Sequence, residues 1–369
     1  MKNLVRKEIL NFTPYIPGKP VDEVKREFKI INKIIKLASN ENAIGVSKKV
    51  ISKLSKALGK IFIYPESSCY YLRNKLAKKL KVSPKELICG AGSDEIIEII
   101  AKTFLNPSDN IIVSEHAFIR YKMAGDLMGC KIISVPMKEF THDLAAMAGR
   151  INSNTKAVFV ANPNNPTGTY NTVAEVEQFL ETCSKMNKDM LVIFDEAYYE
   201  YSKILPDYPE MTGYRAQYPN LIILRTFSKI YGLAGLRIGY GIMNKEIIEF
   251  LDRIRPPFNV NSIAQAAAIL ALDDTKHVKD SIRVIEEGKK YLYKELKKLN
   301  LEFVPSGTNF ILIKVSPLKG KDVFTGLLKK GMIVRAMDEY DYPDYIRVTI
   351  GKPGENKKFI KYVRELLTK

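Results

Sequence analysis

Residues 221–240, LIILRTFSKIYGLAGLRIGY, decide the fold, because two apolar stretches flank a short charged turn. The run LIIL at residues 221–224 predicts a buried parallel strand. It ends abruptly at RTFSK (225–229), and a glycine-punctuated turn precedes a second predicted strand at residues 236–241. A lysine at the end of a buried strand, among hydroxyls and glycines, indicates a chemical role beyond solubility.

Lys229 is the candidate reactive residue of this stretch. Beside a second cation, Arg237, and in a desolvated cleft, the ammonium form of a lysine is disfavoured, and a neutral lysine attacks carbonyl carbons. Thr226, Ser228 and Arg237 supply two hydroxyls and a planar guanidinium, the parts of a phosphate cup. An isolated Ser-Lys pair is more often a solvated surface feature, so the assignment depends on motifs elsewhere in the chain.

The composition is that of a soluble globular protein. The chain has 369 residues, 46% of them hydrophobic and 27% charged, which allows two domains with sizeable cores. The four cysteines form no CxxC pair and the three histidines have no metal-ligand spacing, which argues against a metal site or a disulfide framework and favours the cytoplasm. Residues 1–10 lack the apolar core of a signal peptide, and no apolar run approaches the roughly 20 residues that cross a bilayer.

The formal net charge of +17 raises the alternative of a nucleic-acid-binding protein. The positive residues are mostly lysines, spread as single residues and pairs along predicted helices, with no long basic block. A lysine-rich solvated surface is the better interpretation, although the charge can steer anionic substrates toward the protein.

The lysine stretch resembles that of the fold-type I aminotransferases, which bind pyridoxal phosphate. The heptad NPNNPTG (162–168) and the strand MLVIFDEAY (190–198) carry the same resemblance. Within this family the chain is most similar to the histidinol-phosphate aminotransferases, above all in the segment PPFNVNSIAQAAA, which begins at Pro256. The matching motifs run from Tyr15 to Arg347 and so cover nearly the whole chain.

The resemblance implies an α/β fold with a large domain, whose mostly parallel seven-stranded sheet lies between helices, and a smaller α+β domain. We expect residues 1–40 to form an N-terminal arm and part of the small domain, residues 41–255 the large cofactor-binding domain, and residues 256–369 the small C-terminal domain. The double proline at residues 256–257 ends the preceding helix and marks the expected joint.

Asp195 ends the apolar strand at residues 190–194, and open α/β sheets bind ligands at such strand ends. From the residues alone, Asp195 could equally cap the following helix. The resemblance implies that it pairs with the pyridinium nitrogen of the cofactor and keeps it protonated. It also implies that Asn165 and Tyr198 share the phenolic oxygen, and that Lys229, Asp195 and Tyr198 form the catalytic set.

The phosphate and the ring of the cofactor have their own expected partners. Gly92, Ser93 and Asp94 lie where a strand passes into a helix, a place that favours phosphate binding, with Ser93 or Asp94 as the helix cap. The resemblance implies that Phe118 stacks on the pyridine ring. It further implies that Tyr64 reaches the cofactor phosphate of the other subunit, so that a homodimer shares its active sites.

A nicotinamide-dependent dehydrogenase is the alternative from another class. Gly90 and Gly92 after a strand, with Glu115 beyond the next strand, imitate a dinucleotide fingerprint. Glu95 occupies the third glycine position, where it would crowd and repel a pyrophosphate, so this signal is weak.

The substrate residues are predicted at the two ends of the chain. Arg347 lies in a β-branched strand, and a buried strand arginine must face an anion, although an internal salt bridge would satisfy it as well. With the resemblance, Arg347 is the expected receptor for the substrate anion. Arg335, at the end of a predicted strand over residues 331–335, is a second candidate, beside Tyr15 and Asn309.

The implied activity is ping-pong transamination between L-histidinol phosphate and 2-oxoglutarate, which yields glutamate, in histidine biosynthesis. Bidentate guanidinium geometry suits both phosphate and carboxylate, so Arg347 could serve both half-reactions. An aromatic amino-acid aminotransferase acting on phenylalanine or tyrosine is the nearest alternative, and a threonine-phosphate decarboxylase is a weaker one.

Overall fold

A seven-stranded sheet forms the centre of the computed structural model, which describes residues 2–10, 12–15, 18–28 and 34–368. Its order is β2 (Leu87–Gly90), β10 (Gly239–Ile242), β9 (Leu221–Thr226), β8 (Leu191–Asp195), β7 (Thr155–Ala161), β3 (Asn110–Ser114) and β4 (Lys131–Val135). Only β10 runs antiparallel to its neighbours. The predicted mostly parallel seven-stranded sheet is therefore confirmed.

Both faces of this sheet are covered, which explains its uninterrupted apolar strands. In β9, Leu221 and Ile223 belong to one core cluster, and Ile222 and Leu224 to another. The first cluster includes residues of α4 (Tyr70–Leu80), α7 (Leu144–Ala148), α8 (Val173–Met186) and α11 (Ser262–Leu272). The second includes residues of α5 (Ser93–Phe104), α6 (Arg120–Met128) and α10 (Lys245–Ile254). The alternation follows from the period of two in a strand.

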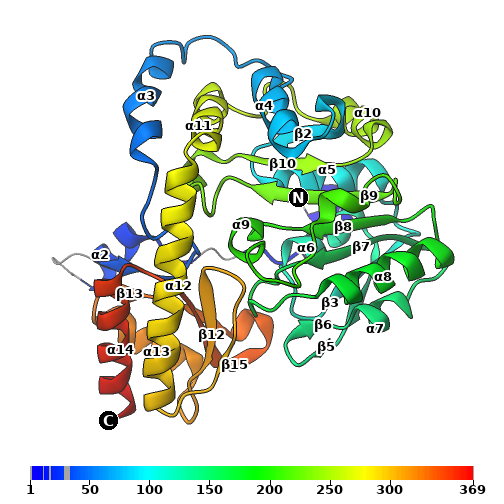
Figure 1. Cartoon of the computed structure of the whole chain (residues 1–369). Coiled ribbons are helices and arrows are strands. Elements are labelled where there is room, and N and C mark those ends of the chain that lie inside the picture. The colour runs from blue at the N-terminus through cyan, green and yellow to red at the C-terminus, as the bar shows by residue number, and fades with distance from the viewer. Residues whose placement is uncertain (1, 11, 16–17, 29–33, 369) are drawn as a thin grey trace.

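A smaller half lies beside the sheet, at the lower left of Figure 1. Its antiparallel sheet has the order β11 (Phe303–Val304), β12 (Phe310–Lys314), β15 (Tyr342–Thr349) and β14 (Arg335–Met337). It is accompanied by α13 (Gly320–Lys329) and α14 (Pro353–Leu367). The long helix α12 (Thr275–Lys298) extends between the two halves in Figure 1.

The N-terminal region contributes to the smaller half. Its helix α2 (Val21–Phe28) and strand β1 (Ile35–Lys36) belong to that half, and β1 pairs in parallel with β13 (Met332–Ile333). In contrast, α1 (Lys7–Leu10) packs against α6 of the large half. The boundary at residues 255–256 stays a prediction, because α11, which follows it, packs against α3 (Lys48–Leu58) and α4. None of the helices in the described ranges is both long and apolar enough to span a membrane.

Three local predictions are wrong. Residues 236–238 are not yet strand, because Arg237 has a φ of +53°, and β10 begins only at Gly239. The predicted strand at 331–335 is split between β13 and β14, which belong to different sheets. Neither Ser93 nor Asp94 caps α5, because Gly92 is its N-cap and no side chain caps the helix.

Candidate active site

Two adjoining cavities lie where β7, β8 and β9 end. The smaller, about 130 Å³, is lined by most of the residues predicted to hold the cofactor: Ser93, Asp94, Phe118, Asn165, Asp195, Tyr198, Thr226, Ser228, Lys229 and Arg237. The larger, about 340 Å³, shares Lys229 and Tyr198 with it and adds Tyr15, Arg335 and Arg347. The fold thus gathers both predicted sets of residues around one continuous site.

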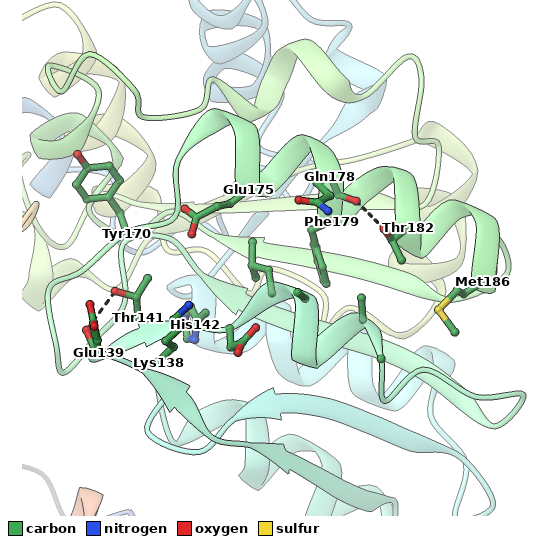
Figure 2. Close-up of a pocket in the computed structure, with 15 residues that line it drawn as sticks. Lys138, Glu139, Thr141, His142, Tyr170, Glu175, Gln178, Phe179, Thr182 and Met186 are labelled. Carbon is green, nitrogen blue, oxygen red and sulfur yellow. Dashed lines mark hydrogen bonds between the residues drawn. The ribbon is translucent and has the colours of Figure 1, made fainter.

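A third cavity, about 620 Å³, lies between α8 and the hairpin of β5 (Met137–Lys138) and β6 (Thr141–His142), as Figure 2 shows. None of the predicted residues lines it. Asp143 caps α7 and Glu175 belongs to the capping box of α8, so both carboxylates accept hydrogen bonds from backbone N–H groups. Burial lowers the pKa of His142 to about 4, which keeps the ring neutral. The candidate active site is therefore at the two adjoining cavities.

The start of α5 and the turn after β9 form a polar cup. Gly92 has a φ of +85°, and a Cβ added there would lie 2.6 Å from Arg237 Nη2, so glycine leaves room for the guanidinium. Arg237 lies 3.6 Å from Asp94 Oδ2, and the Ser228 N–H donates to Thr226 Oγ1 at 3.0 Å. The N–H groups of an uncapped helix start, two hydroxyls and a guanidinium together suit a phosphate group.

Asp195 is a buried carboxylate at the end of β8. Burial raises its pKa to about 6, while a hydrogen bond from Tyr121 opposes this rise. The Tyr121 hydroxyl donates to Oδ2 at 2.8 Å, and the Ala197 N–H donates to Oδ1 at 3.1 Å. A buried carboxylate of this kind gains from a cationic partner in the cavity, and a protonated pyridine nitrogen is such a partner.

Lys229 lies in the turn that follows β9, close to the N-terminal segment around Ser39. Its Nζ donates to the Ser39 carbonyl oxygen at 3.3 Å and lies 5.6 Å from the centre of the Tyr198 ring. The Tyr198 hydroxyl accepts a hydrogen bond from Asn40 Nδ2 at 2.9 Å. The lysine amine and the tyrosine hydroxyl therefore face the cavity that Asp195 also lines.

Arg347 lines the larger cavity and contacts Asn165, which lines both. It is 8% exposed and lies in β15, in register with Arg335 of β14. Its Nη1 donates to Asn165 Oδ1 and its Nη2 to the Ala38 carbonyl at 2.7 Å, while its Nε is buried without a hydrogen-bond partner in the described part of the chain. No described carboxylate forms an ion pair with Arg347, which disfavours the internal salt bridge, whereas Arg335 pairs with Glu339.

Three predicted residues lie outside the linings of both cavities. Gly92 contributes only the backbone turn before α5. Asn309 is fully buried, and its Nδ2 donates to the carbonyl oxygens of Asn40 and Glu41, at 3.0 and 3.2 Å. Tyr64 is 79% exposed and stacks on Phe258, with ring centres 4.7 Å apart.

The sequence did not single out several residues that line the site. Tyr121 and Arg120 follow Phe118 closely, and Ser39, Asn40 and Tyr340 line the larger cavity. Tyr121 is the second residue of α6 and belongs to no motif, so the sequence offered no pattern that singles it out.

The dinucleotide alternative finds no support at the glycine loop. Glu95 turns back to the loop, where its Oε2 accepts from the Ala91 N–H at 2.7 Å and from Asn259 Nδ2 at 2.6 Å. This carboxylate therefore ties the loop between β2 and α5 to the segment after α10. It occupies the space beside the loop that a third glycine would leave open.

The residues present fit pyridoxal phosphate. The cup at α5 matches a phosphate, Asp195 matches a pyridinium nitrogen, Phe118 supplies a flat apolar surface, and Lys229 supplies an amine, all around one cavity. The close approach of Arg237 to Gly92 is the observation that tests the fit, because any other side chain at position 92 would displace the guanidinium from the cup.

Comparisons with known proteins agree with this geometry. The family model "Aminotransferase class I and II" matches residues 32–363. A histidinol-phosphate aminotransferase of Moorella thermoacetica is 48% identical over 98% of this chain and 92% of its own length, and one of Caldicellulosiruptor saccharolyticus is 44% identical over 99% and 100%.

The fold is shared with a solved structure as well. The histidinol-phosphate aminotransferase of Sinorhizobium meliloti, in complex with pyridoxal-5'-phosphate, has a TM-score of 0.87 at 24% identity and covers 98% of both chains. With the family model and the two relatives, this chain belongs to the class I and II aminotransferases and, within them, to the histidinol-phosphate aminotransferases.

Proposed function

We propose that this protein is a pyridoxal-phosphate-dependent aminotransferase that moves an amino group between L-histidinol phosphate and 2-oxoglutarate. One observation carries the proposal: a cavity lined by Lys229 and Asp195 adjoins a second cavity lined by Arg335 and Arg347. The first suits the cofactor, and the second offers guanidinium groups to an anionic substrate. The named activity of the relatives is the same.

The residues divide the work of the reaction. Pyridoxal phosphate, when bound, supplies an electron sink for the charge that develops as the substrate loses its Cα proton. Lys229 Nζ holds the cofactor and, once the substrate amine has replaced it, takes the Cα proton. Asp195 keeps its negative charge beside the ring nitrogen, and Tyr198 and Asn165 orient the phenolic oxygen.

Three arginines at the larger cavity support a substrate that carries a phosphate group. Arg335 and Arg347 lie in register on adjacent strands, and Arg120 also lines the larger cavity. The buried Arg347 Nε is a donor that an incoming anion could satisfy. A phosphate ester carries more charge than a carboxylate, whereas phenylalanine offers these arginines only its α-carboxylate. The site therefore favours histidinol phosphate over the aromatic alternative.

The homodimer with shared active sites remains part of this proposal. Phe62 and Tyr64 are 83% and 79% exposed, and Ile61, Ile63, Tyr70 and Tyr71 are exposed beside them in sequence. Such a run of exposed apolar side chains is typical of an interface. A cytoplasmic location is proposed as well, since the four cysteines are all buried free thiols.

Replacement of Phe62 by aspartate tests the dimer. We expect the dissociation constant of the dimer to rise about 10-fold or more, because the substitution places a charge in an apolar interface. Sedimentation equilibrium measures it. Ile204→Asp, at a side chain that is 48% exposed and outside this run, is the matched control. A Phe62→Asp protein that stays as dimeric as the control would contradict the proposed interface.

Single-turnover kinetics test the proposed substrate. The cofactor-loaded protein is mixed with L-histidinol phosphate or with L-phenylalanine, and the absorbance of the bound cofactor is followed. We expect conversion with histidinol phosphate to be faster by about 10-fold or more, since one lost charge-assisted contact costs about 1.5–3 kcal/mol. Equal or reversed rates would indicate an aromatic aminotransferase, and failure to bind the cofactor would refute the proposal.

A further inference from the structure

Tyr121 makes a direct contact with the carboxylate that is expected to face the cofactor. It is the second residue of α6 and is 1% exposed. Its hydroxyl donates to Asp195 Oδ2 at 2.8 Å, and both residues line the 130 Å³ cavity. Because the Ala197 N–H holds the other oxygen at 3.1 Å, the plane of the carboxylate is fixed from two sides.

The tyrosine ring is itself held firmly. It stacks on Phe159, with ring centres 5.1 Å apart and planes inclined by 13°, and it meets the edge of Phe118 at 5.7 Å and 84°. These are favourable aromatic geometries. The hydroxyl therefore has little freedom to leave Asp195, and the same ring supports Phe118, the predicted stacking partner of the cofactor.

The groups around Asp195 shift its pKa in opposite directions, and the Tyr121 hydrogen bond is one of those that lower it. Burial raises the pKa of Asp195, Asp94 of α5 raises it further, and Lys229 and the Tyr121 hydrogen bond lower it. The pKa of Tyr121 lies well above its ordinary value because of burial, so the hydroxyl keeps its proton and donates it to the Asp195 carboxylate. Tyr198, on the same segment as Asp195, also faces this group.

We propose that Tyr121 is a positioning residue that keeps Asp195 ionised and aimed at the ring nitrogen of pyridoxal phosphate. The proposal rests on the proposed function, because only a cofactor with a basic ring nitrogen needs an ionised partner at this place. It adds to the predicted set a residue that acts on the cofactor through Asp195.

Tyr121→Phe tests the proposal, because it keeps the ring and its stacking and removes only the hydroxyl. We expect the affinity for pyridoxal phosphate, measured by equilibrium dialysis, to fall about 10- to 100-fold, the range for a lost hydrogen bond to a charged group. Loss of a donor raises the pKa of a carboxylate. The weakening of cofactor binding at acid pH should therefore begin about one pH unit higher than in the wild type.

Tyr201→Phe is the matched control. Tyr201 is also 1% exposed, and its hydroxyl has no hydrogen-bond partner in the described part of the chain. We expect its affinity for the cofactor, and the pH at which acid begins to weaken cofactor binding, to equal those of the wild type.

A double-mutant cycle separates positioning from a general structural effect. In an Asp195→Asn background, Tyr121→Phe should change cofactor affinity by less than about twofold, because the charge it supports is gone. Equal losses of cofactor affinity in both backgrounds would overturn the proposal. So would a Tyr121→Phe single variant that binds the cofactor as tightly as the wild type, with no shift in the pH at which acid weakens binding. If the wild type itself fails to bind pyridoxal phosphate, the proposed function falls first, so the two failures are distinguishable.

Discussion

Replacement of Lys229 by alanine is expected to lower the turnover number by about 10⁴-fold or more. The variant loses the amine that we propose holds the cofactor and takes the Cα proton, and removal of a residue with both roles costs at least as much as loss of a general base alone. Steady-state assays with L-histidinol phosphate and 2-oxoglutarate measure the loss.

The polar cup should survive this substitution. Thr226, Ser228 and Arg237 stay in place, so Lys229→Ala should still bind pyridoxal phosphate, although without the covalent link and its absorbance. Lys185→Ala, at an exposed lysine of α8 whose partner is Glu181, is the control and should keep full activity. Turnover by Lys229→Ala within tenfold of the wild type would refute the assignment of Lys229.

Replacement of Arg225 by methionine is expected to lower the free energy of unfolding by about 3–5 kcal/mol, the usual cost of leaving a buried ion-pair partner alone. Arg225 is 1% exposed in β9, and its guanidinium contacts Glu196 at 2.8 Å and Glu210 at 3.1 Å. The guanidinium carbon also lies 3.4 Å from the centre of the Tyr199 ring. Denaturant unfolding at pH 7 measures the loss.

The control for this prediction follows from the carboxylate of Glu196, the buried partner of Arg225. Glu196 is fully buried, and burial raises its pKa to about 7, so without Arg225 it must stay charged at a high cost or take up a proton. Adding Glu196→Gln to Arg225→Met should recover much of the stability. Glu181→Ala, which removes an exposed pair in α8, should cost less than about 1 kcal/mol. An Arg225→Met protein as stable as Glu181→Ala would contradict a stabilising role for the buried pair.

Sequence reasoning selected polar residues that lie in or just after apolar strands, where a polar group has to find a partner or a ligand. Asp195 ends β8, Lys229 follows β9 and Arg347 lies within β15, and the fold brings all three to the two adjoining cavities, while their roles stay predictions. Arg225 directly follows the apolar run LIIL, but sequence reasoning assigned it neither a role nor a partner. In the structure its partner is Glu196, which directly follows Asp195 in sequence but pairs with Arg225 and does not line the cofactor cavity.

Local geometry was harder to predict. The N-cap of α5 is Gly92, which has no side chain and leaves the first N–H groups of the helix open to a ligand, and no composition rule decides between this glycine and the serine that follows it. The bend at Arg237 was equally hidden, because a non-glycine residue with positive φ is uncommon. Tyr121 belongs to no motif, and only the packing of α6 against α5, β3 and β4 brings its hydroxyl to Asp195.

The segment at residues 37–40 has a consequence for the time course of synthesis. The Asn40 N–H donates to Thr349 Oγ1 at 2.9 Å, and Arg347 donates to the Ala38 carbonyl, and in each case the partners are 309 positions apart in sequence. At a translation rate of about 5–20 residues per second, this strip of chain waits roughly 15–60 s for its partners to leave the ribosome. All seven strands of the large sheet precede residue 243, whereas Arg347 of β15 emerges about 100 residues later, so a nascent chain that ends before β15 lacks part of the proposed substrate site.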